Sequence, residues 1–261
     1  MTQPEPLPKR PTESAPAVHS LRIMTVNTHK GFAWLNRRFI LPELRDAVQT
    51  TSSDIVFLQE VLGAHHRHGK RVRNWPDVPH YEFLDSLWQD FAYGRNAVYP
   101  EGHHGNALLS KFPIIEFNNL DVSIDGTEER GMLHAVLDVP GHREVHAICV
   151  HLGLRESHRT QQLHLLGGLL DSLSPEAPVI VAGDFNDWRL QADAQLAERG
   201  LQEAFVKAHG APAKSFPARW PLLRLDRIYV RNATTHNPEV LSQRPWSHLS
   251  DHAPLVVEVH L

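Results

Sequence analysis

The pattern of apolar and polar residues predicts a chain built mainly from short β-strands. Runs rich in Val and Ile favour buried strands, because β-branched side chains suit a covered, pleated surface. Leu21–Asn27 alternates, whereas Val179–Ala182 is continuously apolar. The strands expected from these patterns span residues 21–27, 54–61, 81–83, 91–98, 105–110, 131–139, 144–150, 179–182, 225–230 and 253–259.

Helical spacing of apolar residues is less frequent. The clearest amphipathic helix is expected over 159–173, where leucines recur every three or four residues. A helix is also expected over 41–51, with Pro42 in its first turn, and a short one over 192–198. Residues 63–79 are polar and basic and predict an exposed loop, and Pro140-Gly141 predicts a hairpin turn.

The body of the chain contains no internal repeat and no linker-like stretch, which predicts a single domain over residues 21–261. Residues 1–20 are rich in Pro, Glu, Thr and Ser and predict a disordered tail. Many strands with few helices between them favour two packed sheets with helices outside.

Composition narrows the function classes. The 261 residues carry a net charge of -4, so no global basic field points to nucleic acid. The single cysteine, Cys149, excludes an internal disulfide framework and a Cys-rich zinc site, and it is expected to be a buried apolar side chain. No apolar run has the length of a membrane-spanning helix, and the N-terminus lacks the apolar segment of a signal peptide, so we expect a cytoplasmic protein.

Histidine is frequent, with 19 copies, and His65, His66 and His68 form a cluster. Such a cluster can bind a metal ion or simply lie in a solvated loop. We favour the solvated loop, because Arg67 and Lys70 would repel a bound cation.

Polar residues follow or open one predicted strand after another, and this pattern points to a catalytic pocket. Groups at strand ends collect in one crevice, and Glu and His are not turn formers. Gly183 is expected to turn the chain at the end of its strand, so that Asp184 and Asn186 emerge on one face. The polar strand-end residues are Asn27, Glu60, His151, Asp184, Asn186, Asp226, Asp251 and His252.

Taken in order, these motifs resemble the endonuclease/exonuclease/phosphatase superfamily of magnesium-dependent phosphodiesterases. The resemblance covers nearly the whole body of the chain, and the order of the motifs makes it specific. It implies an α/β (α+β) fold: a four-layer sandwich of two central, mostly antiparallel sheets flanked by helices. The matching segments are Asn27 with Lys30-Gly31, Gln59-Glu60, residues 105–110, His151-Leu152, residues 183–186, residues 225–228 and residues 250–252.

The resemblance also implies roles for these residues. Glu60, supported by Asn27 and Asp251, would hold Mg²⁺, with Mn²⁺ as a substitute, since magnesium takes oxygen ligands. Asp184 would orient and deprotonate the attacking water. Asn186 would donate its amide to a phosphate oxygen. His252 would contact the phosphate, with its ring held by Asp226, and His151 would act as general acid.

Three further residues are candidates for substrate binding. Asn106 is expected to line the pocket, and Arg130 and Arg155 are expected either to grip a phosphate or to be ordinary surface arginines.

The substrate class stays open between two phosphodiesters. A lipid headgroup with peripheral membrane contact fits the apolar segments Phe32–Leu35 and Trp220–Leu223, and we favour it slightly. A DNA or RNA endo- or exonuclease would use the same aromatic residues for base stacking. The same polar groups could also cleave a terminal phosphate, as in a phosphomonoesterase. A non-catalytic binding module is not favoured, because no strand-end group is missing, and nothing in the sequence indicates an obligate protein partner.

Overall fold

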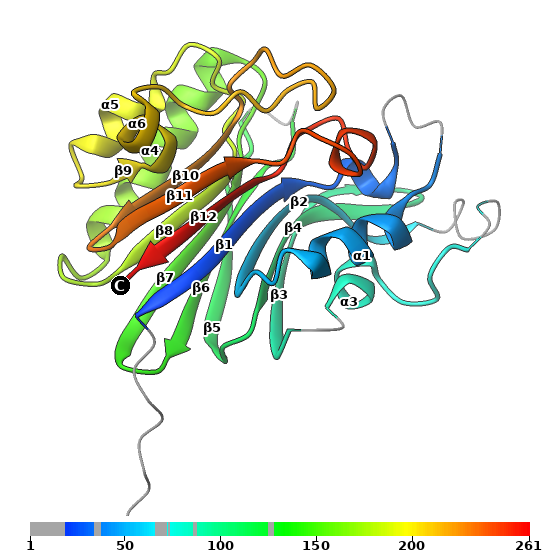
Figure 1. Ribbon diagram of the computed structural model, residues 1–261, viewed down its shortest axis with the longest axis horizontal. Coiled ribbons are helices and arrows are strands. Elements are labelled where there is room, and N and C mark those ends of the chain that lie inside the picture. The colour runs from blue at the N-terminus through cyan, green and yellow to red at the C-terminus, as the bar shows by residue number, and fades with distance from the viewer. Residues whose placement is uncertain (1–18, 34–37, 66–71, 73, 86–87, 125–127) are drawn as a thin grey trace, which may run out of the picture.

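The computed structural model describes residues 19–33, 38–65, 72, 74–85, 88–124 and 128–261. Most of the predicted tail, Trp34, and the greater part of the basic loop with His66 and His68 lie outside these described residues. Two six-stranded sheets form the centre of the fold (Figure 1).

The first sheet has the strand order β11-β12-β1-β2-β4-β3. Its central pair, β1 and β2, is parallel, and the other neighbours are antiparallel. The strands are β11 (Thr234–Val240), β12 (Leu255–His260), β1 (Ser20–Asn27), β2 (Ile55–His65), β4 (Gly102–Ser110) and β3 (Asp90–Tyr99).

The second sheet repeats this plan with the order β5-β6-β7-β8-β10-β9, and its central pair, β7 and β8, is again the parallel one. Both sheets are therefore mostly antiparallel, as predicted. The strands are β5 (Ile114–Asp121), β6 (Gly131–Val139), β7 (His142–His151), β8 (Val179–Asp184), β10 (Asp226–Arg231) and β9 (Gln202–Glu203).

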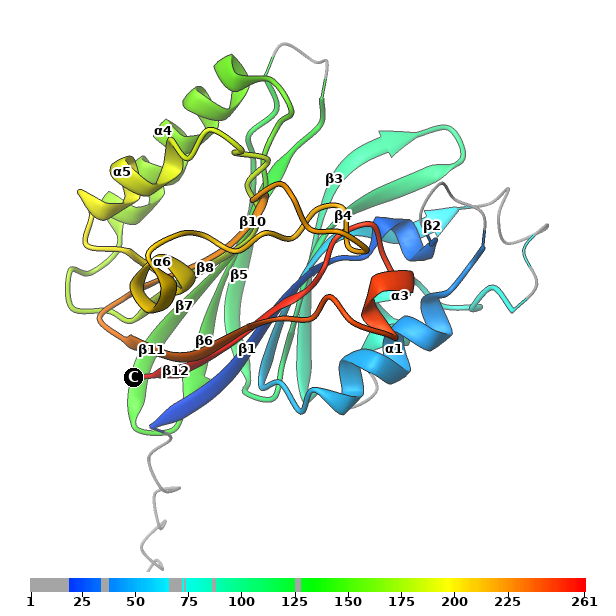
Figure 2. The same ribbon diagram turned by 45° about the horizontal axis from the view of Figure 1, so that its top comes forward.

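Helices cover the outer faces of the two sheets and complete the four predicted layers (Figures 1 and 2). The first sheet packs against α1 (Leu41–Thr50) and α3 (His80–Leu84). The second packs against α4 (Glu156–Ser172) and α5 (Ala192–Ala197). Among the described residues, the other helical segments are α6 (Ala204–His209) and the 3-10 turns η1 (His29–Gly31) and η3 (Trp246–His248). In the described ranges, no helix combines the length and the apolar character needed to cross a bilayer.

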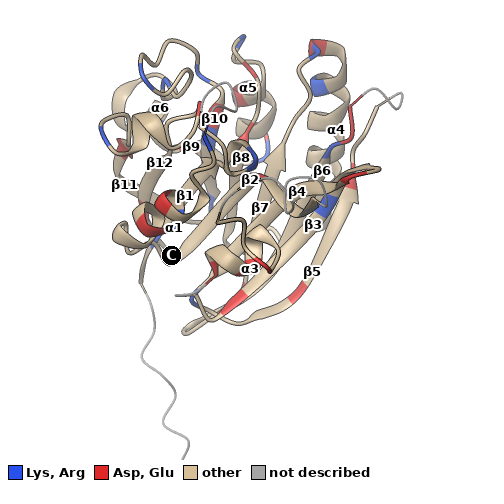
Figure 3. Cartoon of the chain, turned by 90° about the vertical axis from the view of Figure 1, so that its right-hand side faces the viewer, with Lys and Arg blue, Asp and Glu red and all other residues tan. Residues whose placement is uncertain are grey.

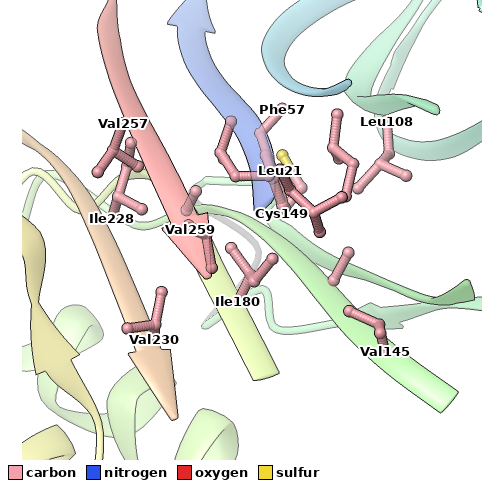
Figure 4. Close-up of a cluster of buried hydrophobic side chains, with 14 of the residues drawn as sticks. Leu21, Phe57, Leu108, Val145, Cys149, Ile180, Ile228, Val230, Val257 and Val259 are labelled. Atoms are coloured by element: carbon pink, nitrogen blue, oxygen red, sulfur yellow. The ribbon is translucent and has the colours of Figure 1, made fainter. Parts of the chain in front are cut away.

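The main core lies between the sheets. Figure 4 shows Phe57 and Leu108 of the first sheet facing Cys149 and Ile180 of the second. Cys149 is fully buried, as predicted, and burial raises the pKa of its thiol to about 12. Its sulfur accepts a hydrogen bond from Gln59 Nε2 at 3.3 Å, which ties the two sheets together.

Several elements differ from the sequence predictions. Tyr81–Phe83 belongs to helix α3 rather than to a strand. A short run with aromatic residues is compatible with both structures, so the sequence pattern did not separate them. Residue 105 is not in a turn: β4 already begins at Gly102 and forms a hairpin with β3. The strands β5, β9 and β11 and the helix α6 were not predicted.

Candidate active site

The two parallel strand pairs bring the predicted polar residues to one end of the sandwich. Asn27 ends β1 beside Gln59 of β2, and His151 ends β7 beside Asp184 of β8. Asp226 opens β10 opposite Asp184. Residues 251 and 252 precede β12, which runs antiparallel to β1 and so begins at this same end.

Glu60 lies on a β-bulge inside β2, rather than at the predicted strand end. Between Leu58 and Val61 the strand has one residue more than β4, so Gln59 and Glu60 both oppose Asn106. Glu60 has a φ of 55°, and its side chain is 20% exposed. The bulge therefore aims this carboxylate at the strand-end cluster while β2 continues to His65.

Asn27 connects the two sheets at the site. Its amide Nδ2 lies 3.3 Å from Glu60 Oε1 and 3.3 Å from Asp184 Oδ2. Its Oδ1 accepts the backbone N–H of His29 at 3.0 Å. The ring of His29 continues the chain of contacts, since its Nδ1 lies 3.7 Å from Asp251 Oδ1.

Asp184 is held at the end of β8 by its neighbours. Gly183 does not turn the chain, contrary to expectation; it has a φ of 148° within the strand, and a Cβ there would lie 2.0 Å from Val150 O. Asn186 is left-handed (φ 50°), so the chain is not extended as expected, and its backbone N–H donates to Asp184 Oδ1 at 2.9 Å. Its side-chain Nδ2 donates to Leu152 O at 3.0 Å.

His252 lies between two buried carboxylates. Its Nδ1 is 2.8 Å from Asp226 Oδ2, and its Nε2 is 3.8 Å from Asp184 Oδ2. Ser250 helps to fix this segment, because its hydroxyl donates to Asn27 O at 2.6 Å and accepts the backbone N–H of His252 at 3.2 Å.

His151 faces Asp184 from the other side, with its Nε2 3.6 Å from Asp184 Oδ2. Arg130 lies next to it: its Nε donates to Leu152 O at 3.2 Å, and its guanidinium is 3.9 Å from Glu128 Oε2. Arg130 is thus part of the cluster rather than a free surface arginine.

Burial and neighbouring charges drive the two site carboxylates in opposite directions. Burial alone would raise the pKa of Glu60, but His151 whenever it is protonated, Lys30 and His29, with the Asn27 hydrogen bond, lower it to about 2. Burial raises the pKa of Asp184 to about 7; His252 and the backbone hydrogen bond from Asn186 oppose this rise, and Asp226 and Glu60 add to it.

The two histidines diverge in the same way. Burial would lower the pKa of His252, but Asp226 and Asp184 raise it to about 10, so the ring is protonated at neutral pH. Burial and then Arg130 hold the pKa of His151 well below its usual range, so that ring is neutral.

Two sets of ligands at this end could hold a metal ion. Asp184, Asp226 and His252 each offer a ligand atom, and these atoms lie within 4.8 Å of one another. Glu60, Asn27 and Asp251 form the other set, with carboxylate side chains that are 20% and 19% exposed.

Two predicted substrate residues lie apart from the open face of the cluster. Asn106 is fully buried between the sheets, where its Nδ2 donates to Gly131 O at 2.9 Å and to Cys149 O at 3.4 Å. Arg155 is exposed at the residue before α4.

Sequence reasoning gave no role to three residues at the site. Lys30 lies 3.9 Å from Glu60 Oε2, and His29 bridges toward Asp251. His104, on β4 opposite Leu62 of β2, has a pKa lowered to about 4 by burial and then by Lys30, with Glu60 opposing. The proximity of residues 29 and 30 to Asn27 in sequence was a usable signal; for His104 only the pairing of β4 with β2 reveals it.

The arrangement belongs to a known family. The family profile described as Endonuclease/Exonuclease/phosphatase family matches residues 24–252. This chain is a member of that family, whose name covers nucleases and phosphatases.

Two relatives share much of the sequence. The uncharacterized protein YbhP of Escherichia coli (strain K12) is 59% identical over 245 residues, which cover 93% of this chain and 97% of that protein. The protein of the same name from Shigella flexneri matches to the same extent.

Solved structures share the fold at low identity. An endonuclease/exonuclease/phosphatase from Beutenbergia cavernae superposes with a TM-score of 0.73 at 20% identity, covering 94% of this chain and 72% of that one. One from Bacteroides vulgatus gives 0.71 at 19% identity, with coverage of 93% and 99%. D. rerio TDP2, complexed with single strand DNA product, gives 0.68 at 18% identity, with coverage of 93% and 99%.

Proposed function

We propose that this protein hydrolyses phosphodiester bonds with the help of a divalent metal ion, Mg²⁺ or Mn²⁺ as its substitute. The observation that carries the proposal is the pair of carboxylates that Asn27 joins at one end of the sandwich: its Nδ2 lies 3.3 Å from Glu60 Oε1 and 3.3 Å from Asp184 Oδ2, and the surroundings lower the pKa of Glu60 and raise that of Asp184. Carboxylates separated in this way commonly take different chemical roles.

Glu60, Asn27 and Asp251 would hold the metal. Glu60 is ionised and partly open to solvent, and its oxygens lie 3.3 Å from Asn27 Nδ2 and 3.9 Å from Lys30 Nζ, so this carboxylate can take a hard cation. The Asp184–Asp226–His252 set suits a metal less well, because Asp226 Oδ2 is already hydrogen-bonded to His252 Nδ1 at 2.8 Å and all three side chains are buried. Bound at Glu60, Mg²⁺ would supply positive charge beside a phosphate oxygen.

Asp184 would orient a water molecule and accept its proton. A pKa of about 7 makes this carboxylate a base matched to neutral pH. Asn186 keeps one amide N–H for a phosphate oxygen while the other donates to Leu152 O.

His252 would stabilise the charge that builds on the phosphate. It carries its own positive charge, and Asp226 fixes the ring through Nδ1, which leaves Nε2 facing the site. His151 is neutral in the free protein, so its proposed role as general acid depends on a bound phosphate anion raising its pKa. Arg130, next to His151, would contact the same phosphate.

For the substrate we favour the phosphodiester of a lipid headgroup. Trp220, Leu222 and Leu223 are exposed on a hairpin whose Phe216 packs 5.0 Å from the His252 ring. The second candidate is a nuclease, which the similarity to a TDP2 structure complexed with single strand DNA product favours. The cytoplasmic location, the single domain and the absence of an obligate protein partner stay predictions from the sequence.

Hydrolysis of bis-p-nitrophenyl phosphate, with and without Mg²⁺, tests the reaction. We expect turnover that requires the metal and that is lost in Asp184→Ala. Full activity in that variant, or no turnover by the pure wild-type protein, would contradict the proposal. Mg²⁺ binding measured by calorimetry in Glu60→Gln and Asp226→Asn then tests which set of ligands holds the ion, since only the first substitution should weaken it, by about a hundredfold.

A further inference from the structure

Three loops at the active-site end share one composition. They follow β7 (residues 152–155), follow β8 (185–191) and precede β10 (211–225), and these three strands are neighbours in the second sheet. Each loop carries exposed large apolar side chains: Leu154, Trp188 and Leu190, and Trp220, Leu222 and Leu223.

Each of these loops also pairs apolar residues with arginine in the sequence. Arg155 follows Leu154, Arg189 stands between Trp188 and Leu190, and Arg219 and Arg224 flank the segment Trp220–Leu223. We define the three loops, with these apolar and arginine side chains, as the rim. Between Glu203 and Asp226 the chain carries Lys and Arg and no carboxylate.

The rim adjoins the catalytic cluster. Leu152 O accepts the amide of Asn186 at 3.0 Å, and Phe185 N donates to Leu225 O at 2.9 Å. Ala218 N, in the third loop, donates to Asp251 O at 2.7 Å. A narrow apolar cleft of about 30 Å³, lined by Trp220, Ser250 and Asp251 among others, lies where this loop meets the site.

Backbone hydrogen bonds organise the third loop. Residues 216–223 form a small hairpin, here the tryptophan hairpin, closed by an isolated bridge between Phe216 and Leu223. Leu222 N and Leu223 N both donate to Phe216 O at 2.8 Å. Trp220 is nevertheless 74% exposed and Leu222 65% exposed, so the hairpin holds apolar groups in solvent without packing them.

We propose that the rim docks on a phospholipid surface, so that the site faces the headgroup phosphodiesters. This inference rests on the proposed phosphodiesterase function and adds a binding surface to it. Apolar and aromatic side chains next to arginines suit the bilayer interface, where the first enter the acyl boundary and the second meet phosphates.

Two other occupants fit the rim less well. A nucleic acid would need a series of stacking platforms, but Trp220 is the single exposed ring of the third loop, leucines offer none, and one face of the Trp188 ring is covered by the Arg159 guanidinium at 4.5 Å. Figure 3 shows the described Lys and Arg segments interspersed with Asp and Glu segments along the chain, and in the second loop Arg189 pairs with Glu156 at 2.6 Å. A protein partner seated here would cover the entrance to the site, whereas a bilayer brings the substrate with it.

Co-sedimentation of the full chain with vesicles tests the docking. The probe is a mixture of phosphatidylglycerol and phosphatidylcholine, and pure phosphatidylcholine shows the contribution of the arginines. We expect the double variant Trp220→Ala/Leu222→Ala to reduce the vesicle-bound to free ratio by about tenfold, since binding scales with the buried apolar area. The matched control is Ile115→Ala/Phe117→Ala on β5, which removes side chains that are 60% and 53% exposed.

The outcomes separate docking from catalysis. Asp184→Asn should bind vesicles like the wild type, because docking needs no turnover. Leu154→Ser, on a different loop, should weaken binding as well, which covers the case that the hairpin variant does not fold. No binding by the wild type, equal losses in the control variant, or displacement of the protein from vesicles by a single-stranded oligonucleotide would overturn the proposal.

Hydrolysis of bis-p-nitrophenyl phosphate without vesicles keeps the two proposals apart. Vesicle binding without any such hydrolysis would contradict the proposed function and leave the docking surface standing. Hydrolysis without vesicle binding would do the reverse.

Discussion

Glu60 and Asp184 occupy comparable places in the two sheets and behave in opposite ways. Each lies at the active-site end of a central parallel pair, β2 of the first sheet and β8 of the second. Glu60 sits on a bulge with a 20% exposed side chain and a lowered pKa, whereas Asp184 ends a regular strand with a 2% exposed side chain and a raised pKa. Equivalent positions in similar sheets thus acquire different chemistry from one local irregularity and the charges around it.

The largest expected effect comes from removing the base. We expect Asp184→Asn to lower kcat for bis-p-nitrophenyl phosphate by about 10³-fold, within the range for general base catalysis. Mg²⁺ binding at Glu60 should remain, which calorimetry can check. A loss of metal binding as large as the loss of turnover would mean that Asp184 and Glu60 do not act separately as base and metal ligand.

Glu60→Gln should act on the metal instead. The neutral amide keeps the shape but removes the charge, so we expect the Mg²⁺ concentration for half-maximal activity to rise by about a hundredfold. The control is Glu43→Gln, an exposed glutamate on α1 that pairs with Arg38. Unchanged metal dependence in Glu60→Gln would contradict the proposal that Glu60, unlike Asp184, holds the metal ion.

Asp226→Asn tests how the His252 ring is held beside Asp184. Asp226 acts through the His252 ring, so we expect a decrease in kcat of about 10- to 100-fold with KM little changed. The substitution should also lower the pKa of His252, because Asp226 is the strongest of the interactions that raise it. NMR titration of the His252 ring measures this, and a merely structural role would leave that titration unchanged.

The last prediction concerns stability rather than catalysis. It tests how burial alone changes the pKa of a carboxyl group outside the site. Glu203 caps α6 by accepting the backbone N–H of Val206, and burial raises its pKa from 4.5 to about 7. Its protonated form is favoured in the folded state, so stability is highest below the unfolded pKa and is lost as the pH rises through about 7.

For Glu203 the loss between about pH 5 and pH 8 should reach roughly 2–3 kcal/mol, given 1.36 kcal/mol per pKa unit. Urea unfolding at both pH values in the wild type and in Glu203→Gln measures it. The variant should lose this part of the pH dependence. An identical pH dependence in both proteins would show that burial alone does not raise a carboxyl pKa here.

The sequence predicted the parts of the fold that have strong internal patterns. The strands β1 and β8 and the helix α4 lie where the alternation, the apolar run and the leucine spacing predicted them, although β1 is buried on both faces from Ile23 to Asn27. The edge strands β5 and β11 were not predicted, because neither has a pattern of alternating buried residues. All residues of β5 are exposed or half-exposed, and β11 contains Pro238.

The site was predictable as a set of residues but not as a geometry. The order of motifs brought together Asn27, Glu60, Asp184 and His252, because strand ends meet at one edge of a sheet. The bulge at Glu60 was not predictable, since it depends on how β2 pairs with β4, which is distant in sequence. The same limit explains Asn106, whose buried position follows from the packing of one sheet on the other.

The bulge in β2 has a consequence for how this chain tolerates change. Exchanging Glu60 for another residue alters one side chain. Deleting it would remove the extra position and make β2 regular at this point, because Leu58 and Val61 already lie on one face, opposite Ala107 and Gly105. Val61 and Leu62 would keep their partners on β4, and only the carboxylate would be lost. The extra residue therefore places a carboxylate at the site and is not needed for the pairing of the sheet.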